Sequence, residues 1–263
     1  MKSATPAIRV SALSFSVGGQ KLLDDIHFQI DLGERIAIIG ANGAGKTTLL
    51  RCLLGLLKPD SGEVSIHGDN IIHLTRSQIA RNISYVPQML NAEIPFTVQD
   101  FILMSRYAHT SLNGSLIPKD KEGIDIAQAM MKQAGIEHLA QRNLSTLSGG
   151  ERQKASIAAA LTQQSPILLL DEPAAHLDPK QQDSIRHLLD QVSQSENRTI
   201  ITVTHDLNWA AADFDRILSM KKGHLIHDSK PTELITSENL AEIFDAHWEV
   251  HPHPQTGNPM VIR

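Results

Sequence analysis

The fold of this chain is decided by the stretch Gly40-Ala41-Asn42-Gly43-Ala44-Gly45-Lys46-Thr47. It follows the apolar run 36–39 and precedes a leucine-rich segment, so the pattern G-x-x-x-x-G-K-[ST] stands between an expected strand and an expected helix. Glycines let successive backbone N–H groups turn inward around phosphate oxygens, and the helix N-terminus adds about half a unit of positive charge. Lys46 supplies a mobile cation, and the Thr47 hydroxyl can hold Mg²⁺. A plain glycine-rich turn would need neither side chain, so we expect a nucleoside triphosphate to bind here.

A second motif, Leu147-Ser148-Gly149-Gly150-Glu151, lies about a hundred residues later. Ser148 and Glu151 form a capping box, which predicts that a helix begins there and continues through residues 152–161. Two glycines in a first helical turn cost about 1 kcal/mol each relative to alanine. That cost is understandable if the backbone lies against a ligand, because a capped helix N-terminus binds anions.

Two strands are predicted to end in polar side chains. Residues 167–170 are four large apolar residues, which favours a strand buried on both faces of a parallel sheet. Asp171, at its carboxyl end, can hold Mg²⁺ as the partner of Thr47, and the adjacent Glu172 could polarise an attacking water. A second apolar run, 199–203, is followed by His205. Taken alone, His205 could be an ordinary strand-end histidine, but its order and spacing behind a phosphate loop favour a functional role.

The motifs GANGAGKTT, VPQ, LSGGE, ILLLDEP, HLD and TVTHD together resemble the nucleotide-binding subunits of ATP-binding cassette (ABC) transporters, over about Leu13 to Leu234. The resemblance implies that the Walker A phosphate loop is formed by Gly40, Ala41, Asn42, Gly43, Ala44, Gly45, Lys46, Thr47 and Thr48. It implies that Gln88 is the Q-loop glutamine, which bridges Mg²⁺, the attacking water and the transmembrane partner. It implies that the signature, which touches the γ-phosphate of the opposite subunit, comprises Ser148, Gly149, Gly150 and Glu151.

For the remaining motifs the resemblance implies that Asp171 is the Walker B aspartate on the metal and that Glu172 is the catalytic base. Asp178 would be the D-loop aspartate at a dimer seam, and His205 the switch histidine on the γ-phosphate. Many relatives carry an aromatic residue that stacks on adenine at the position of Val17, just before Gly18-Gly19. Either Val17 or Phe15 is therefore expected at the base.

We expect an α/β fold: a P-loop NTPase core with a mixed sheet flanked by helices, an N-terminal antiparallel β-subdomain and an inserted helical subdomain. The chain would be a single ABC ATPase domain, 1–263. The core and the β-subdomain would take residues 8–88 and 166–230, the helical subdomain 89–165 and a C-terminal tail 231–263. Alternation of apolar and polar residues over 8–30 around a Gly-Gly turn predicts the antiparallel strands, and periodicity predicts helices over 98–107 and 125–139.

Composition limits the function classes. The net charge is −5, without a block of five like charges, which argues against nucleic-acid binding by a basic face. Cys52 is the only cysteine, so no internal disulfide can form, and a reducing compartment is expected. No apolar run approaches the length of a membrane span, and the first twenty residues lack the apolar stretch of a signal peptide. In the tail, His247, His251 and His253 fit either a metal cluster or a surface tail, and we favour the surface tail.

Residues 97–100 and 104–109 are similar to the importers of iron-siderophores, haem and cobalamin, although those relatives often have glycine at Ser105 and proline at Ala108. The implied function is hydrolysis of ATP with Mg²⁺ in a head-to-tail homodimer, at the cytoplasmic face of the inner membrane. The dimer would power integral-membrane permease subunits and, indirectly, serve a substrate-binding protein. The alternatives are a soluble ABC ATPase of the cofactor-assembly type, an importer ATPase for another substrate, and a binding module that has lost hydrolysis. The last disagrees with the presence of Lys46, Gln88, Asp171, Glu172 and His205.

Overall fold

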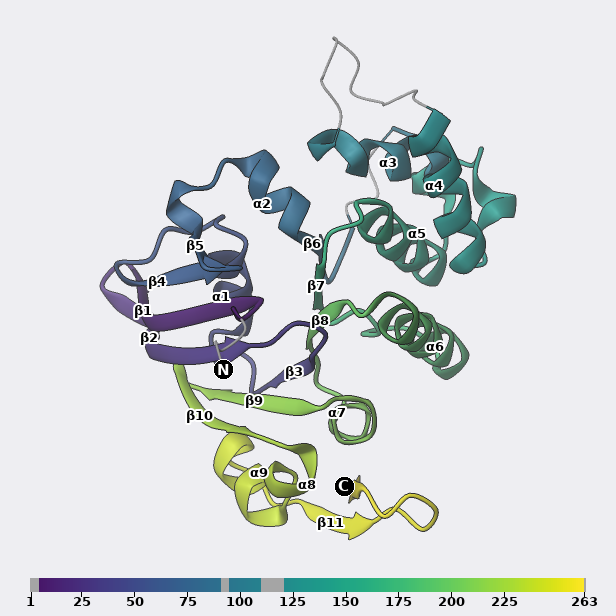
Figure 1. Cartoon of the computed structure of the whole chain (residues 1–263). Helices are drawn as coiled ribbons and strands as arrows, with labels where there is room; N and C mark the ends of the chain where they lie inside the picture. The colour runs from purple at the N-terminus through teal and green to yellow at the C-terminus, as the bar shows by residue number, and fades with distance from the viewer. Residues whose placement is uncertain (1–4, 91–94, 110–120, 263) are drawn as a thin grey trace. The chain divides into compact units, whose positions relative to one another are not determined.

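A computed structural model describes residues 5–90, 95–109 and 121–262 of the chain (Figure 1). These residues form two compact units. The first comprises the described residues within 1–74 and 199–263, and the second those within 75–198. Among the described residues, none of the helices has both the length and the apolar character that a membrane crossing requires.

An antiparallel sheet opens the first unit, with the strand order β2-β1-β4-β5. Its strands are β1 (Ile8–Val17), β2 (Gln20–Ile30), β4 (Ser61–Ile66) and β5 (Asp69–Asn70), followed by the 3₁₀ turn η1 (Ile71–His73). Gly18 and Gly19 join β1 to β2 with φ of 58° and 82°, and Val17 pairs with Gln20 across the turn. A two-residue hairpin turn of this hand needs positive φ at both central positions, which glycine adopts without a steric penalty. The predicted N-terminal antiparallel sheet is confirmed.

Four strands of a mixed sheet, in the order β10-β9-β3-β8, belong to the first unit. β3 pairs in parallel with both β8 and β9, and β10 runs antiparallel to β9. The predicted mixed α/β fold is confirmed, and the phosphate-loop sequence lies between a buried strand and a helix, as expected. The elements are β3 (Arg35–Ile39), α1 (Lys46–Leu53), β8 (Thr199–Val203), α7 (Leu207–Asp213), β9 (Arg216–Lys221), β10 (His224–Ser229), α8 (Pro231–Leu234), α9 (Ser237–Phe244), β11 (Glu249–Pro252) and β12 (Pro259–Ile262).

Helix α1 anchors the phosphate loop through its apolar face. Leu49, Leu50, Cys52 and Leu53 are all buried. Burial raises the pKa of the Cys52 thiol to about 11, so the thiolate that would react with oxidants is scarce at neutral pH. Cys52 therefore acts as a small apolar side chain that fixes the helix behind the loop.

The second unit combines a parallel pair of strands with helices. Its strands are β6 (Ile83–Val86) and β7 (Ile167–Asp171), and its α-helices are α2 (Arg76–Asn82), α3 (Val98–Met104), α4 (Lys121–Gln133), α5 (Gly149–Thr162) and α6 (Pro179–Glu196). Short 3₁₀ segments are η2 (Ser105–Ala108), η3 (Glu137–Leu139) and η4 (Leu144–Thr146). α3, α4 and α5 pack against one another.

The prediction of one helix over 125–139 was wrong at its C-terminal end. α4 ends at Gln133, and Gly135 follows with a φ of 68° before the separate 3₁₀ segment η3 begins. A residue in the left-handed region ends an α-helix because it turns the backbone out of the helical path.

Candidate nucleotide-binding site

The phosphate loop connects the carboxyl end of β3 to the first turn of α1. Lys46 is 6% exposed, and its ammonium donates to the carbonyl oxygens of Gly40 at 2.8 Å and Ala41 at 3.0 Å. The cation therefore lies inside the curve of the loop, bonded to its backbone. Thr47 is exposed in the first turn of α1, where the helix dipole favours a bound anion.

The glycines of the loop are required for two different reasons. A Cβ on Gly40 would lie 2.3 Å from the carbonyl oxygen of Met220 on β9, and a Cβ on Gly45 would lie 2.6 Å from that of Leu22 on β2. Gly43 instead has open space around it but a φ of 78°, which L residues rarely adopt. From the sequence, we expected all the glycines to serve the approach of phosphate. Gly40 and Gly45 are also needed by the strands of this chain.

His205 stands beside the phosphate loop in the strand register. Ile38 of β3 pairs with Val203 of β8, and the Thr204 N–H donates to the Ile38 carbonyl at 3.2 Å. The two neighbouring parallel strands therefore end at the same edge, one leading into the loop and the other into His205. The His205 side chain is exposed. This edge is where open α/β sheets bind their ligands.

In the second unit, β7 ends in the two predicted carboxylates. Asp171 is only 3% exposed, whereas Glu172 is half-buried. Glu172 has a φ of 49°, in the left-handed region that a non-glycine residue seldom occupies. The Gln88 side-chain amide, just beyond β6, donates to Glu172 Oε2 at 2.9 Å. The structure thus brings the expected Q-loop glutamine into direct contact with the expected base.

The signature sequence forms the N-terminus of α5 as predicted. The Ser148 N–H donates to Glu151 Oε2 at 2.8 Å, and the Glu151 N–H donates to Ser148 Oγ at 3.3 Å. These bonds make the reciprocal capping box, and the bond from the Ser148 N–H is the main reason that the pKa of Glu151 lies below its usual value. Ser148 and Gly149 are exposed, so the first turn of this helix faces outward.

Asp178 has a structural task that the motif did not predict. Its carboxylate accepts a hydrogen bond from the Gln181 N–H at 2.9 Å and caps the N-terminus of α6, with Pro179 at the first helical position. Aspartate at an N-cap followed by proline is a common start for a helix. A role of Asp178 at a dimer seam stays a prediction.

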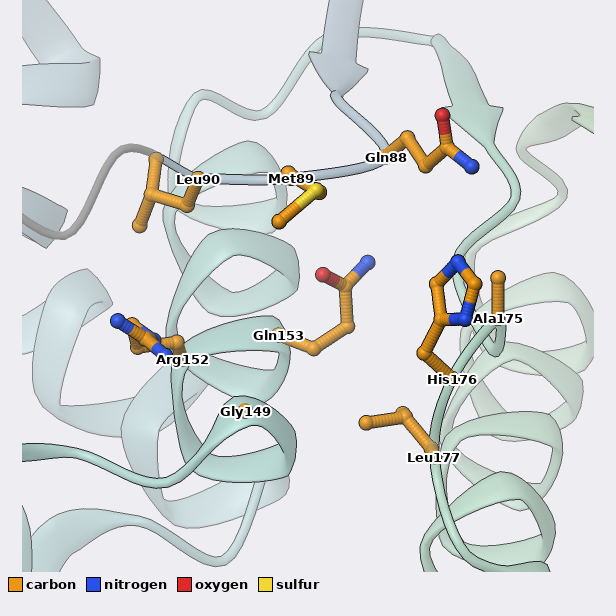
Figure 2. Close-up of a pocket in the computed structure, with 9 residues that line it drawn as sticks. All are labelled: Gln88, Met89, Leu90, Gly149, Arg152, Gln153, Ala175, His176 and Leu177. Carbon is orange, nitrogen blue, oxygen red and sulfur yellow. The ribbon is translucent and has the colours of Figure 1, made fainter.

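A cavity of about 490 Å³ joins the Q-loop to the signature helix within the second unit (Figure 2). Among the residues that line it, only Gln88 and Gly149 were given a role from the sequence, whereas His176 and Leu177 belong to the quoted HLD motif without a role of their own. Gln153 lies one turn after Gly149 on α5, and in Figure 2 its amide points toward the ring of His176. The i, i+4 spacing on the predicted helix could have identified Gln153, whereas His176 follows a strand and gives no such signal. The complete lining is Gln88, Met89, Leu90, Gly149, Arg152, Gln153, Ala175, His176 and Leu177.

The two remaining questions of the sequence concern the base and the tail. Val17 is 58% exposed at the end of β1, whereas Phe15 is half-buried and pairs with Leu23. In the tail, His253 Nδ1 accepts from the N–H groups of Gln255 and Thr256 at 3.3 Å. Across the described residues, no group of three or more histidine, cysteine, aspartate or glutamate side chains is arranged to hold a metal ion.

Comparison with known proteins identifies the family. The ABC transporter family matches residues 23–175. The cobalamin import ATP-binding protein BtuD of Halobacterium salinarum is 36% identical over 94% of this chain, which spans 61% of that relative's length. The ferric enterobactin transport ATP-binding protein FepC of Escherichia coli is 33% identical over 100% of this chain and 96% of its own length. The hemin import ATP-binding protein HmuV of Hahella chejuensis is 35% identical over 97% of this chain and 99% of its own.

Solved structures agree with this assignment. A putative metal-chelate type ABC transporter in an inward-facing conformation has a TM-score of 0.84 and 27% identity, covering 98% of this chain and 97% of its own. A dimeric bacterial ABC transporter cassette has a TM-score of 0.74 and 28% identity, covering 85% and 98%. With the phosphate loop, the capped signature helix and these matches in agreement, this chain belongs to the ABC transporter family.

Proposed function

We propose that this chain is the subunit that hydrolyses ATP to import a metal chelate of the iron-siderophore, haem or cobalamin class through a membrane permease. One observation supports the transport class: a ferric enterobactin transport ATP-binding protein and a hemin import ATP-binding protein each match nearly the whole of this chain and of themselves. The similar solved transporter, described as metal-chelate type, supports the same class.

The contact between Gln88 and Glu172 supports a hydrolytic role. Glu172 would take a proton from water as the water oxygen attacks the γ-phosphorus and the bond to the bridging oxygen of ADP breaks. The Gln88 amide, 2.9 Å from Glu172 Oε2, would orient that carboxylate. Lys46 and His205 would neutralise the charge of the γ-phosphate, because developing charge in phosphoryl transfer is stabilised mainly by positioned cations and N–H donors.

The residues proposed for Mg²⁺ offer the ligands that this ion prefers. Asp171 supplies a carboxylate, Thr47 a hydroxyl and Gln88 an amide oxygen, all of them hard oxygen donors. The carboxylate of Asp171 is buried at the end of β7, and a cation is the partner that stabilises a buried negative charge. When bound with ATP, Mg²⁺ would offset the charge of the phosphates.

The exposed signature helix supports a second copy of this chain as partner. The first turn, with Ser148 and Gly149, is exposed and favours an anion, which the γ-phosphate of a partner subunit would supply. A head-to-tail homodimer with Asp178 at its seam would then bury two ATP molecules in composite sites. Permease subunits would contact the surface around Gln88 and residues 96–100 and hold the dimer at the cytoplasmic face of the membrane. A substrate-binding protein would take part only through the permease.

Hydrolysis is tested with Glu172→Gln. The amide keeps the size of the side chain but cannot accept the proton, and general-base assistance is worth about 10²- to 10⁴-fold in rate. The variant should bind ATP, lose most turnover and accumulate as a dimer in light scattering. Glu233→Gln, on an exposed turn in α8, is the matched control. Near-normal turnover by Glu172→Gln would remove this residue from its role.

The composite site is tested by mixing two inactive proteins. Ser148→Arg places a bulky cation at the signature, and Lys46→Ala removes the cation of the phosphate loop. In a mixed dimer one composite site carries both lesions and the other neither, so about one quarter of wild-type activity should return if the copies exchange freely. An absence of recovery despite demonstrated exchange would argue against the shared site.

The transport assignment is tested by co-purification from a native membrane. A hydrophobic permease that binds the wild type, and that is released by substitutions in residues 96–100, would support the importer. A soluble partner bound in its place would favour the alternative, an ABC ATPase of the cofactor-assembly type that works without a permease.

A further inference from the structure

Helix α7 begins directly behind His205, and two hydrogen bonds fix the backbone on either side of that histidine. The Asp206 N–H donates to Thr204 Oγ1 at 3.0 Å, and Asp206 Oδ1 accepts from the Trp209 N–H at 2.8 Å and caps the helix. Thr204 is in turn bound to the strand that leads into the phosphate loop, through the Ile38 carbonyl. The direction in which His205 projects therefore depends on how α7 is held.

One face of α7 packs into the core. Trp209 is 2% exposed, and its ring meets Phe214 edge-to-face at a centroid distance of 5.3 Å. Ala210 and Ala211 are also buried. This face holds the helix against the unit.

The other face of α7 is tied to the C-terminal hairpin of β11 and β12 (Figure 1). The Asn208 amide nitrogen donates to the Val261 carbonyl at 3.0 Å, and Asn208 Oδ1 accepts from the Val261 N–H at 2.7 Å. The side-chain amide thus satisfies both backbone groups of one residue, as a neighbouring strand would. Two bonds to one planar amide fix its position and its orientation together.

The hairpin presents Val261 in a defined way. Val261 pairs with Val250 of β11, and because both of its backbone polar groups are bonded to Asn208, this pair is one that does not exchange ladder bonds. Val261 as a whole residue is 9% exposed. The hairpin therefore contacts α7 through a specific pair of hydrogen bonds at Asn208, three residues after His205 in the sequence.

We infer that Asn208, held by the β11–β12 hairpin, is a positioning residue for His205 in ATP hydrolysis. The hairpin sets the orientation of α7, and α7 sets the direction of the histidine that begins it. This inference rests on the proposed role of His205 at the γ-phosphate. It assigns to the C-terminal hairpin a task in catalysis, although none of its side chains would touch the nucleotide.

The test compares Asn208→Ala with Asn239→Ala. Asn239 also donates twice through its amide, to the carbonyls of Glu233 and Leu234 at 3.2 and 3.0 Å, but from the first turn of α9 to the end of α8. If the free energy of two hydrogen bonds of ordinary strength is lost from the transition state, kcat of Asn208→Ala should fall by about five- to 150-fold. KM for ATP and the ATP dissociation constant should stay within about twofold, because the phosphate loop is unchanged. Asn239→Ala should keep the wild-type kcat.

A second variant reaches the same contact from the hairpin. Val261→Pro removes the N–H that donates to Asn208 Oδ1, at a position whose N–H is not needed by β11, and it also replaces the valine side chain and fixes φ. It should also lower kcat, but by less than Asn208→Ala does. Because the two variants probe the same contact independently, the test remains valid if one of them folds poorly. A wild-type kcat in a folded Asn208→Ala or Val261→Pro protein would overturn the inference.

His205→Ala distinguishes the proposed role of His205 at the γ-phosphate from the positioning role of Asn208. If His205→Ala keeps only a low residual kcat, adding Asn208→Ala to it should lower that residual kcat no further, and an additional loss would show that Asn208 acts elsewhere. If His205→Ala hydrolyses ATP normally, the proposed role of His205 fails first. If His205→Ala is inactive and Asn208→Ala behaves like Asn239→Ala, only the positioning role fails.

Discussion

Gly149→Ala should make the protein more stable and less active. Gly149 opens helix α5, its φ is not in the left-handed region, and a Cβ there would meet only Leu177 Cδ2, at 3.9 Å, among the described atoms beyond its own helix and chain neighbours. That distance is an ordinary van der Waals contact. Nothing described within this chain therefore requires glycine at this position, although the sequence carries one.

The expected gain follows from helix propensity. Alanine is favoured over glycine by up to about 1 kcal/mol inside a helix, and about half of that is reasonable in a first turn. For a chain of this size, each kcal/mol corresponds to roughly 2–4 °C in Tm, so Gly149→Ala should raise Tm by about 1–4 °C. The measurement is calorimetric unfolding of the protein without added nucleotide, beside ATP turnover at saturating ATP.

Turnover should fall in the same variant, because a methyl group on the exposed first turn would stand where the partner's γ-phosphate approaches. Gly150→Ala is the control from within the motif. Its Cβ would lie 2.4 Å from Gln181 Cδ, so that flexible side chain must move and the stability gain should shrink or vanish. A lower Tm for Gly149→Ala would refute the account of the helix, and wild-type turnover would refute the account of the ligand.

Three other substitutions probe separate features. Since hydrogen bonds lower the pKa of Glu151 in the folded state, its contribution to stability is present above the unfolded pKa and is lost as the pH falls through the folded one. Glu151→Gln should therefore flatten the loss of unfolding free energy in acid, measured by urea titration at stepped pH. Val17→Tyr should tighten ATP binding by up to about one to two powers of ten, while wild-type ATP and GTP dissociation constants should agree within about tenfold. Arg106→Met should lower Tm, because the buried guanidinium donates to the Thr162 carbonyl at 3.3 Å and to the Gln164 side chain at 2.8 Å, both at the C-terminal end of α5. An unchanged Tm would show that solvent satisfies those two acceptors in the variant.

The elements next to the motifs were predictable because their signals are local. The strand before the phosphate loop, the Gly18-Gly19 turn and the capping box of Ser148 each depend on a few consecutive residues, and all are found as expected. The end of α4 was predicted too late because the apolar pattern continues past Gly135, where the backbone turns left-handed.

Contacts between distant segments could not be predicted in the same way. Three features of the structure bring together residues that are far apart in sequence. They are the close approach of β9 to Gly40, the hydrogen bonds between the Asn208 amide and Val261, and the cavity that His176 lines together with residues of α5. Periodicity assigns a face to a residue but does not name the neighbour on that face. The distinction explains why the motif residues were found, whereas the residues that hold them were not.

The left-handed backbone at Glu172 has a consequence for any attempt to improve this protein. A non-glycine residue in that conformation stores of the order of 1 kcal/mol of strain, which glycine would release. Glycine at position 172 would also remove the proposed base. Laboratory evolution that selects only for thermal stability should therefore enrich inactive variants with glycine at this position. A screen for thermostable variants must also measure ATP turnover.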